Sequence, residues 1–357
     1  MPYRSPHLTA VALRLRAWFL LLTLFVVGIR PGSAAPLTTL PTATIPFSSA
    51  EQTVRDAIRC PNQIANRPGG VVLLVHGTGG TGANSWAETP YIKILPNLDP
   101  GFDVCWIDLP DLAQGDIQMT GEFVAHAITL LALNSTATNG KLTVVSHSQG
   151  ALDVQWALAF WPQTRGLVSA FVSLAGDFKG SLLATAGCKI VSLFNGGKGC
   201  TAATWQQATN SKFLQTLNNA AGLALVPTTS IRSLNDDVVV PQVGENASSV
   251  LPWASNVLLQ DVKVCGPDQD VNHSEMRIDP GAFALAYEAL YRASKAQGSR
   301  PFDQKYCKAY VSNNSGWTVM DAQRAIDQSM GNFRSFFDNT PVKSEPPIMP
   351  YAQAWAP

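Results

Sequence analysis

Short apolar runs alternate with helical patterns along most of this chain, and this alternation constrains the fold more than any other feature. Residues 71–75 are an uninterrupted apolar run, as expected of a strand covered on both faces of a sheet. Further strands are predicted at residues 102–107, 142–145, 168–174, 228–234 and 257–264, and helices at 120–133 and from about 150 to 160. Strands that alternate with helices predict a mostly parallel central sheet flanked by helices. No linker interrupts the pattern, so residues 36–357 are predicted to form one α/β domain.

The pentapeptide at residues 146–150, Ser-His-Ser-Gln-Gly, joins a predicted strand to a predicted helix. A serine hydroxyl is a weak nucleophile unless a base takes its proton and the side chain projects free of the sheet. A sharp strand-to-helix turn with small flanking residues gives this projection, and its usual pattern is G-x-S-x-G. Gly150 supplies the second glycine, and Ser146 replaces the first. We therefore predict that Ser148 is a nucleophile; the alternative is an ordinary loop serine.

A base for Ser148 is found by elimination among the five histidines. In enzymes with this kind of turn the chain order is serine, then acid, then histidine. Only His273 follows Ser148, and it lies in a polar loop after the last predicted strand. The alternative for a single loop histidine is a solvent-exposed side chain, but the required order favours His273 as the base.

The acid is expected between the serine and the histidine. Asp236 and Asp237 directly follow the predicted strand 228–234, and a carboxylate there can orient His273 and stabilise its imidazolium form. Asp177, at the end of the preceding predicted strand, is a rival. Chain position favours the pair at 236 and 237, and spacing does not distinguish between these two neighbours.

A glycine-rich loop, His-Gly-Thr-Gly-Gly at residues 76–80, follows the first predicted strand. Backbone N–H groups of such a loop can face a developing oxyanion, and the N–H of Gln149 is expected to be the second donor. The alternative is a phosphate-binding loop. The absence of a GKS or GKT ending, and of an acidic residue in the ribose-binding position, disfavours nucleotide binding.

The N-terminus has the order of a secretory signal peptide. Arginines precede a 13-residue apolar run at 17–29, and small residues follow at 32–35. A membrane anchor is the alternative, but spanning a bilayer takes about 20 residues. Removing residues 1–35, with their four arginines, leaves 21 basic against 25 acidic residues and a formal charge of −4. We expect a secreted protein with no nucleic-acid partner.

Six cysteines lie beyond the predicted signal peptide, and their even number fits an oxidising compartment. They allow 15 pairings, among which spacing does not choose. Structural zinc is disfavoured because the chain has no CxxC and no clustered Cys/His pair. Glycosylation sequons occur at Asn134, Asn246, Asn272 and Asn313. We expect no glycan at Asn272, since it adjoins His273.

Nine short motifs, in order along nearly the whole mature chain, resemble the Candida antarctica lipase B family of fungal lipases. They are LLVHGTG at 73–79, CWI at 105–107, SQG at 148–150, DFKG at 177–180, WQQ at 205–207, VPTT at 226–229, PQV at 241–243, CGP at 265–267 and MPYA at 349–352. The resemblance implies an α/β-hydrolase fold and hydrolysis of carboxylic esters, including triacylglycerols.

The resemblance also implies roles for individual residues. The positions that match the family's catalytic triad and oxyanion hole are Ser148, Asp236, His273, Thr78 and Gln149. Thr78 would offer both its hydroxyl and its N–H to the oxyanion.

Two further positions, Asp177 and Gln207, match polar residues of the family's acyl pocket, so Asp177 is implied to be a pocket residue and not the acid. The family's disulfides imply the pairs Cys60–Cys105 and Cys265–Cys307. Cys188 and Cys200 have no family counterpart, and as neighbours in sequence they are predicted to close a small loop. The family's C-terminal disulfide is missing.

Other departures bear on the substrate. His147 stands where the best-known family member has a tryptophan that borders the alcohol pocket. Either this pocket is more polar or differently sized, or His147 is simply packed beside the turn. Residues 181–200 are predicted to form a cover over the site. A second candidate cover, 318–337, contains a predicted helix at 319–336 whose apolar stripe either borders the mouth and favours lipid interfaces or faces the core.

The sequence therefore predicts a secreted serine carboxylic-ester hydrolase that acts through an acyl-enzyme, with a triacylglycerol lipase as the first choice. Its expected partners are an ester or lipid substrate and a lipid–water interface. We expect a monomer that requires no metal and no organic cofactor. A short-chain esterase or acyltransferase is the close alternative. A non-catalytic binding protein of the same fold is the alternative from another class, and the correctly ordered Ser148, Asp236 and His273 disfavour it.

Overall fold

The computed structural model describes residues 40–244, 246–294, 301–311, 317, 320–321, 324–325, 327 and 340–357. The predicted signal peptide, residues 1–35, and most of the predicted helix at 319–336 lie outside these residues. The chain divides into two units, Met1–Thr38 and Thr39–Pro357. All described residues belong to the second unit, which is the one characterised below.

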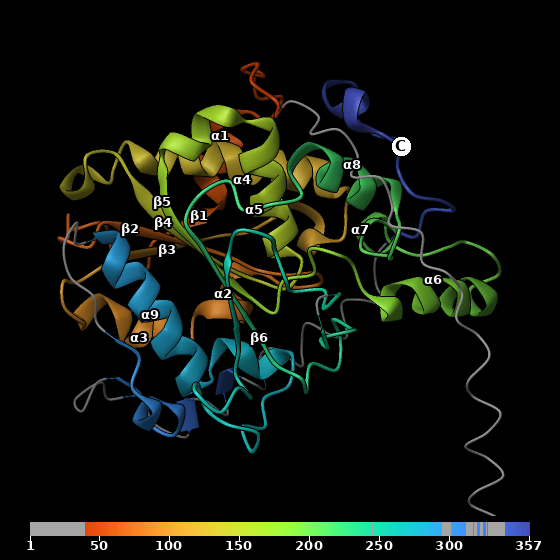
Figure 1. Ribbon diagram of the computed structural model, residues 1–357. Helices are drawn as coiled ribbons and strands as arrows, with labels where there is room; N and C mark the ends of the chain where they lie inside the picture. The colour runs from red at the N-terminus through yellow and green to blue at the C-terminus, as the bar shows by residue number, and fades with distance from the viewer. Residues whose placement is uncertain are drawn as a thin grey trace, which may run out of the picture. The chain divides into compact units, whose positions relative to one another are not determined.

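A seven-stranded sheet forms the centre of this unit, with the strand order β1-β3-β2-β4-β5-β6-β7 (Figure 1). Only β1 is antiparallel to its neighbour, and the other pairs are parallel, as the sequence predicted. The strands are β1 (Ile58–Arg59), β2 (Val71–Val75), β3 (Asp103–Ile107), β4 (Leu142–His147), β5 (Val168–Leu174), β6 (Thr228–Arg232) and β7 (Ser255–Leu258).

Helices cover both faces of the sheet. They are α1 (Glu51–Ala57), α2 (Gly82–Trp86), α3 (Pro90–Lys93), α4 (Ile117–Ala132), α5 (Gly150–Phe160), α6 (Leu182–Phe194), α7 (Ala202–Gln206), α8 (Lys212–Ala221) and α9 (Pro280–Ser294). In Figure 1, α1, α4, α5 and α8 lie above the sheet, and α3 and α9 lie below it. None of the helices in the described part of the chain is long and apolar enough to cross a membrane.

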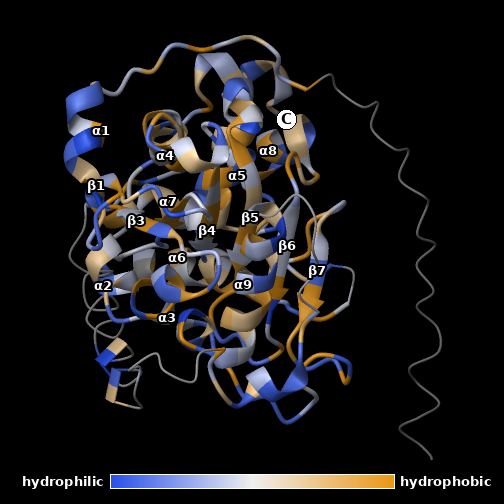
Figure 2. Cartoon of the chain, turned by 90° about the vertical axis from the view of Figure 1, so that its left-hand side faces the viewer, coloured by the Kyte–Doolittle hydropathy of each residue, from blue (hydrophilic) through white to orange (hydrophobic). Residues whose placement is uncertain are grey.

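The core has one hydrophobic cluster on each face of the sheet. In β2, Val71, Leu73 and Val75 belong to one cluster, and Val72 and Leu74 belong to the other. This division follows from the alternation of side chains along a strand, and it explains why the strand reads as a continuous apolar run. Apolar strands lie at the centre of the molecule in Figure 2.

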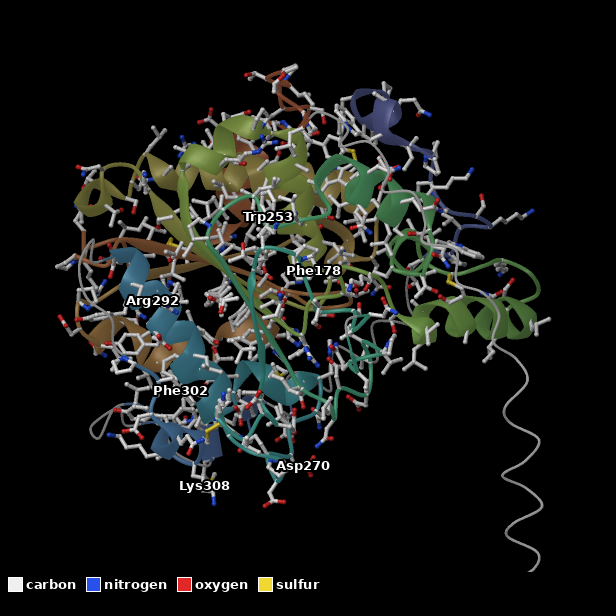
Figure 3. The ribbon with its side chains drawn as sticks, in the orientation of Figure 1. Phe178, Trp253, Asp270, Arg292, Phe302 and Lys308 are labelled. Carbon is white, nitrogen blue, oxygen red and sulfur yellow. A yellow bond between two sulfur atoms is a disulfide. The ribbon has the colours of Figure 1, made fainter. Side chains whose placement is uncertain are left out.

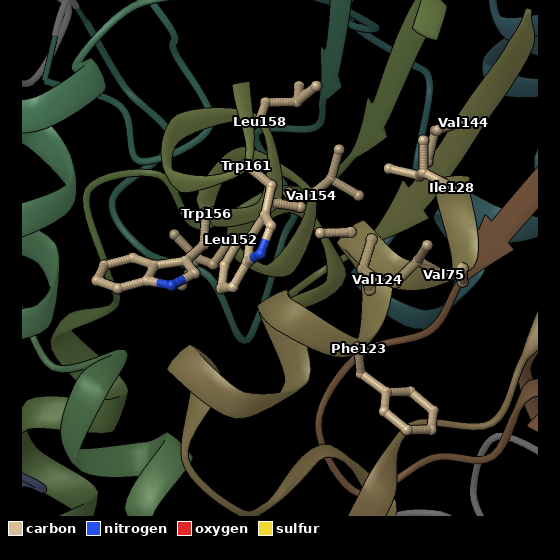
Figure 4. Packing of buried hydrophobic residues seen from close by; sticks show 14 of the residues in the cluster. Val75, Phe123, Val124, Ile128, Val144, Leu152, Val154, Trp156, Leu158 and Trp161 are labelled. Carbon is tan, nitrogen blue, oxygen red and sulfur yellow. The ribbon is translucent and has the colours of Figure 1, made fainter. Parts of the chain in front are cut away.

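The cluster above the sheet is filled by large side chains from the helices. Trp156 and Trp161, at α5 and its C-terminal end, pack near Val124 and Ile128 of α4 (Figure 4). Both tryptophans are fully buried. The helix that follows the turn at residue 148 is therefore packed against the core.

One predicted strand was wrong over most of its length. The prediction was 257–264, whereas β7 ends at Leu258. The Asp261 carboxylate accepts the N–H of Lys263 at 2.8 Å, and the carbonyl of Asp261 accepts the N–H of Val264 at 2.9 Å. These local bonds turn the chain. An aspartate side chain that accepts the backbone N–H two residues later competes with the hydrogen bonds between neighbouring strands.

Three disulfides are formed, Cys60–Cys105, Cys188–Cys200 and Cys265–Cys307, and no described cysteine is free. They confirm both pairings that the resemblance implied and the small loop that closes between residues 188 and 200. In Figure 3 one sulfur–sulfur bond lies between Phe302 and Lys308. The Cys188–Cys200 bond attaches α6 to the segment before α7, and both helices lie together at one edge of the molecule in Figure 1.

Candidate active site

Ser148 lies in a sharp turn between β4, which ends at His147, and α5, which begins at Gly150. Its φ is 56°, in the left-handed region that non-glycine residues rarely adopt. A Cβ atom at Gly150 would lie only 2.7 Å from the carbonyl oxygen of His76, so this position requires glycine. Ser146 is fully buried at the position of the missing first glycine. The strained turn projects the Ser148 hydroxyl from the sheet, as expected of a nucleophile.

Three predicted catalytic residues come together at this turn. His273 Nε2 is 2.9 Å from Ser148 Oγ, and His273 Nδ1 is 2.9 Å from Asp236 Oδ2. All three side chains are buried. The imidazole thus bridges the hydroxyl and the carboxylate, which is the arrangement that a serine nucleophile, its base and an orienting acid require.

The two neighbouring aspartates make different contacts. Asp236 bonds to the His273 ring, and its Oδ1 accepts the N–H groups of Val238 and Val239 at 2.9 and 2.7 Å. Asp237 instead accepts the backbone N–H of His273 at 3.2 Å. The geometry therefore distinguishes two residues that sequence spacing left equivalent.

Thr78, Gln149 and Gln207 form a hydrogen-bonded group beside Ser148. The Thr78 hydroxyl donates to Gln149 Oε1 at 2.5 Å, and Gln207 Nε2 donates to Thr78 Oγ1 at 2.9 Å and to Gln149 Oε1 at 3.0 Å. Within the described residues, no hydrogen bond uses the backbone N–H of Thr78 or of Gln149. These two N–H groups are therefore available to an acceptor that enters the site.

Asp177 is fully buried, and neither of its carboxyl oxygens has a hydrogen-bond partner among the described residues. Burial raises its pKa to about 7, so much of the carboxyl is protonated at neutral pH. No described hydrogen bond joins it to His273, whose charge acts on it only electrostatically, and the described lining of the cavity beside Ser148 does not include it. Asp177 is thus not positioned as the acid, and the structure does not place it on the cavity surface that the resemblance implied.

His147 is both packed and part of the cavity wall. Its Nε2 lies 2.9 Å from the carbonyl oxygen of His273, and the centroids of the two rings are 4.6 Å apart. Since a carbonyl can only accept, His147 Nε2 carries the proton. Burial, followed by the charge of His273, lowers the pKa of His147 well below its usual value, so its ring stays neutral. His147 can therefore be packed beside the turn and also make the pocket more polar, so the two interpretations given by the sequence are compatible.

We expect His147→Phe to lower kcat/KM on a soluble ester about 3- to 10-fold, because the His273 carbonyl loses a buried donor worth about 1 kcal/mol. His147→Gln keeps an N–H donor and should lose less. Steady-state kinetics on both variants, with thermal unfolding to verify the fold, checks this expectation. Equal rates for the phenylalanine variant and the unsubstituted protein would exclude a positioning role for this hydrogen bond.

A cavity of about 750 Å³ opens beside Ser148 and His273. The predicted cover at 181–200 forms part of its wall, through Leu183, Ala184 and Gly187 of α6 and the Cys188–Cys200 disulfide. The second predicted cover, 318–337, lies mostly outside the described residues. The cavity places a volume that fits a small-molecule or acyl group directly against the serine.

Sequence reasoning missed two buried ionisable groups near the site. Arg277, four residues after His273, lines the cavity and is only 4% exposed. Asp153 of α5 is fully buried and accepts the Thr120 hydroxyl at 2.5 Å, and burial raises its pKa well above its usual value. The sequence signal that could have indicated their burial was a single charged residue between apolar neighbours, as in Met276-Arg277-Ile278.

Three of the four sequons fall on described residues. Asn134 and Asn246 are exposed. Asn272 is half-buried, and its Oδ1 accepts the N–H of Glu275 at 3.1 Å. Asn313 lies outside the described residues. Asn134 and Asn246 are thus the more accessible positions, although Asn134 Nδ2 donates to the carbonyl of Leu130 at 3.2 Å.

Comparisons with known proteins agree with the fold and with the chemistry of the site. Residues 70–185 match the model of the alpha/beta hydrolase fold family. The chain is 31% identical to lipase B of Pseudozyma antarctica over 330 residues, which are 91% of this chain and 92% of that protein. The crystal structure of Aspergillus fumigatus lipase B superposes with a TM-score of 0.73 at 29% identity, over 89% of this chain and 74% of that one. The chain therefore belongs to the lipase B family of α/β-hydrolases and is a carboxylic ester hydrolase.

Proposed function

We propose that this hydrolase is a secreted triacylglycerol lipase that acts through an acyl-enzyme, with Ser148 as nucleophile, His273 as base and Asp236 as acid. The observation that carries the proposal is the position of the His273 ring, 2.9 Å from both Ser148 Oγ and Asp236 Oδ2. In this mechanism His273 takes the hydroxyl proton while Ser148 attacks the ester carbonyl, and Asp236 stabilises the imidazolium that forms.

The negative charge on the carbonyl oxygen would be held by the N–H groups of Thr78 and Gln149. The Thr78 hydroxyl would be a third donor. In the unliganded site it donates to Gln149 Oε1, so it must rotate toward the oxyanion when the substrate binds. Gln207 supports this rotation because its Nε2 donates to both Thr78 Oγ1 and Gln149 Oε1. When the Thr78 hydroxyl turns away, Gln149 Oε1 therefore keeps a hydrogen-bond donor.

Collapse of the tetrahedral intermediate releases the alcohol, which takes its proton from His273. Water then attacks the acyl-enzyme, with His273 again as the base, and releases the fatty acid and the free Ser148 hydroxyl. Another alcohol in place of water would give transesterification, so the same residues serve the acyltransferase alternative.

The apolar surface of α6 favours a lipid substrate over a small soluble ester. Leu182, Leu183, Ile190 and Leu193 are 52%, 50%, 53% and 82% exposed, on the helix that forms part of the cavity wall. Exposed apolar patches beside a cavity are typical of lipid or protein contact surfaces. The formal charge of −4 for residues 36–357 makes apolar contact a better basis than charge for adsorption to lipid.

Secretion is supported by the three disulfides, since such bonds persist in oxidising compartments. The signal-peptide pattern at residues 1–35 and the exposed sequons Asn134 and Asn246 agree with this route. Fractionation of expressing cells, with the N-terminus of the mature protein sequenced, tests it.

Rates on p-nitrophenyl esters from acetyl to palmitoyl, and on emulsified triacylglycerol, test the lipase assignment. We expect hydrolysis of the long-chain esters and of the emulsion. Leu193→Ser should lower the emulsion rate several-fold with little change on p-nitrophenyl butyrate, because it weakens adsorption and leaves the catalytic groups intact.

The matched control is Leu133→Ser, at the C-terminal end of α4, where the leucine is 71% exposed and does not line the cavity. It should leave both rates unchanged. Activity confined to acetyl and butyryl esters would replace the lipase assignment with the short-chain esterase alternative.

A further inference from the structure

We propose that Arg277 forms an anion-binding subsite beside the catalytic centre, and that the preferred esters carry a carboxylate or phosphate on their alcohol portion. This inference rests on the serine mechanism of the proposed function, and it goes beyond that function in the substrate class, because the alcohol portion of a triacylglycerol carries no such charge. It begins from a charged side chain that the mechanism does not use.

Arg277 lies at the end of a short 3-10 helix, Ser274–Arg277, which starts directly after His273. The side chain lines the cavity yet is only 4% exposed. Its Nη1 donates to the backbone carbonyl of Ser85 at 2.7 Å, and its buried Nε has no acceptor. A guanidinium has five N–H donors, and the Ser85 carbonyl takes only one of them.

No carboxylate of the described residues lies within ion-pair distance of Arg277. Arg67 and Arg55 do have such partners, Asp103 at 2.6 Å and Glu51 at 2.7 Å, while the half-buried Arg165 donates to the backbone carbonyls of Leu158 and Ala159. A buried and unpaired charge is costly, and proteins normally pair such a group or assign it to a ligand.

The guanidinium nevertheless stays charged at neutral pH. Burial lowers the pKa of Arg277, but only to about 10. An anion that reaches it from the cavity would restore charge balance and supply the missing acceptors. Carboxylate and phosphate are the groups that match the planar fork of a guanidinium.

The leaving group, and not the acyl chain, is expected to carry this anion. His273 must protonate the departing alcohol, so the alcohol portion lies next to its ring. Arg277 is four residues further on in the same loop, and it acts electrostatically on His147, whose Nε2 contacts the His273 backbone. Both residues line the cavity together with Ser85. The anion site is therefore on the side of the alcohol.

The test compares two pairs of substrates that differ only in charge. On the alcohol side, 3-butyryloxybenzoate is measured against its methyl ester. On the acyl side, mono-p-nitrophenyl glutarate is measured against p-nitrophenyl valerate. We expect kcat/KM to favour the alcohol-side anion about 10- to 100-fold, which is the range of a charge-assisted hydrogen-bonded pair, and we expect no preference for the acyl-side anion.

Arg277→Met should abolish the alcohol-side preference, and Arg277→Lys should retain part of it. Lys198→Met removes the other cationic side chain of the described cavity wall and should keep the preference. If Arg277→Met does not fold, the unsubstituted enzyme provides the test of the subsite. Benzoate and inorganic phosphate should inhibit its hydrolysis of the neutral methyl ester competitively.

Equal kcat/KM values for the charged and neutral alcohol-side esters, together with no inhibition by benzoate or phosphate, would overturn the subsite. If the preference is lost in Lys198→Met and kept in Arg277→Met, the anion binds to Lys198 and the assignment to Arg277 is wrong. Absence of hydrolysis on all four esters would instead contradict the proposed function, so the two failures are distinguishable.

Discussion

We expect Ser148→Ala to lower the turnover number on every ester substrate by about five to six orders of magnitude. Alanine keeps the small volume that the turn at residue 148 accepts, but it removes the only oxygen within hydrogen-bond distance of His273 Nε2 in the described structure. The remaining donors at Thr78 and Gln149 would still bind the carbonyl and give a small residual rate. Initial rates on p-nitrophenyl butyrate, together with burst titration of the acyl-enzyme, measure the effect.

The matched control is Ser146→Ala, two residues earlier in the same turn. The Ser146 hydroxyl is buried and has no hydrogen-bond partner among the described residues, so its loss should leave most of the activity. Thermal unfolding of both variants verifies that the turn remains folded. Unchanged hydrolysis by Ser148→Ala would remove this serine from the mechanism and require another nucleophile.

The parallel sheet and the turn at Ser148 were predictable because both depend on local patterns. β2 and β5 have the predicted bounds, since a strand covered on both faces must be apolar throughout. The sixth predicted strand was wrong beyond Leu258. An apolar alternation continued through Val262 and Val264, while Asp261 turned the chain by accepting the backbone N–H of Lys263. Strand β1 spans only two residues, too few for any periodicity to appear.

The assembly of the site depended on chain order more than on local pattern. His273 could be selected because only one histidine follows Ser148. Asp236 and Asp237 are adjacent, and only the loop geometry, with Val238 and Val239 donating to Asp236 Oδ1, turns the first carboxylate toward the histidine ring. Which of the two aspartates faces the histidine ring therefore depends on backbone contacts that sequence spacing does not encode.

Arg277 could not be predicted for a different reason. A single arginine in a loop is most often solvated, and its apolar neighbours Met276 and Ile278 are a weak sign of burial. It becomes buried because the loop that presents His273 folds back over the chain at Ser85, whose carbonyl takes the guanidinium. The charge is therefore a consequence of how the chain positions His273, and in the proposed subsite it would recognise the substrate.

We expect Asp236→Asn to lower the turnover number by about four orders of magnitude, with a small change in KM. The carboxylate accepts from His273 Nδ1 at 2.9 Å, which leaves Nε2 unprotonated and able to take the Ser148 proton. An asparagine amide can donate to Nδ1 instead, and the proton then moves to Nε2, where it blocks the base. The carboxylate also stabilises the imidazolium of the transition state, and a neutral amide does not.

Asp237→Asn is the decisive comparison, since it makes the same chemical change one residue along the chain. Asp237 accepts only the backbone N–H of His273, at 3.2 Å, and an asparagine Oδ1 can accept the same bond. We therefore expect less than a tenfold loss of turnover, measured on the same ester. A larger loss for Asp237→Asn than for Asp236→Asn would mean that the carboxylate which orients His273 during turnover is the second of the pair, and that the loop rearranges when the substrate binds.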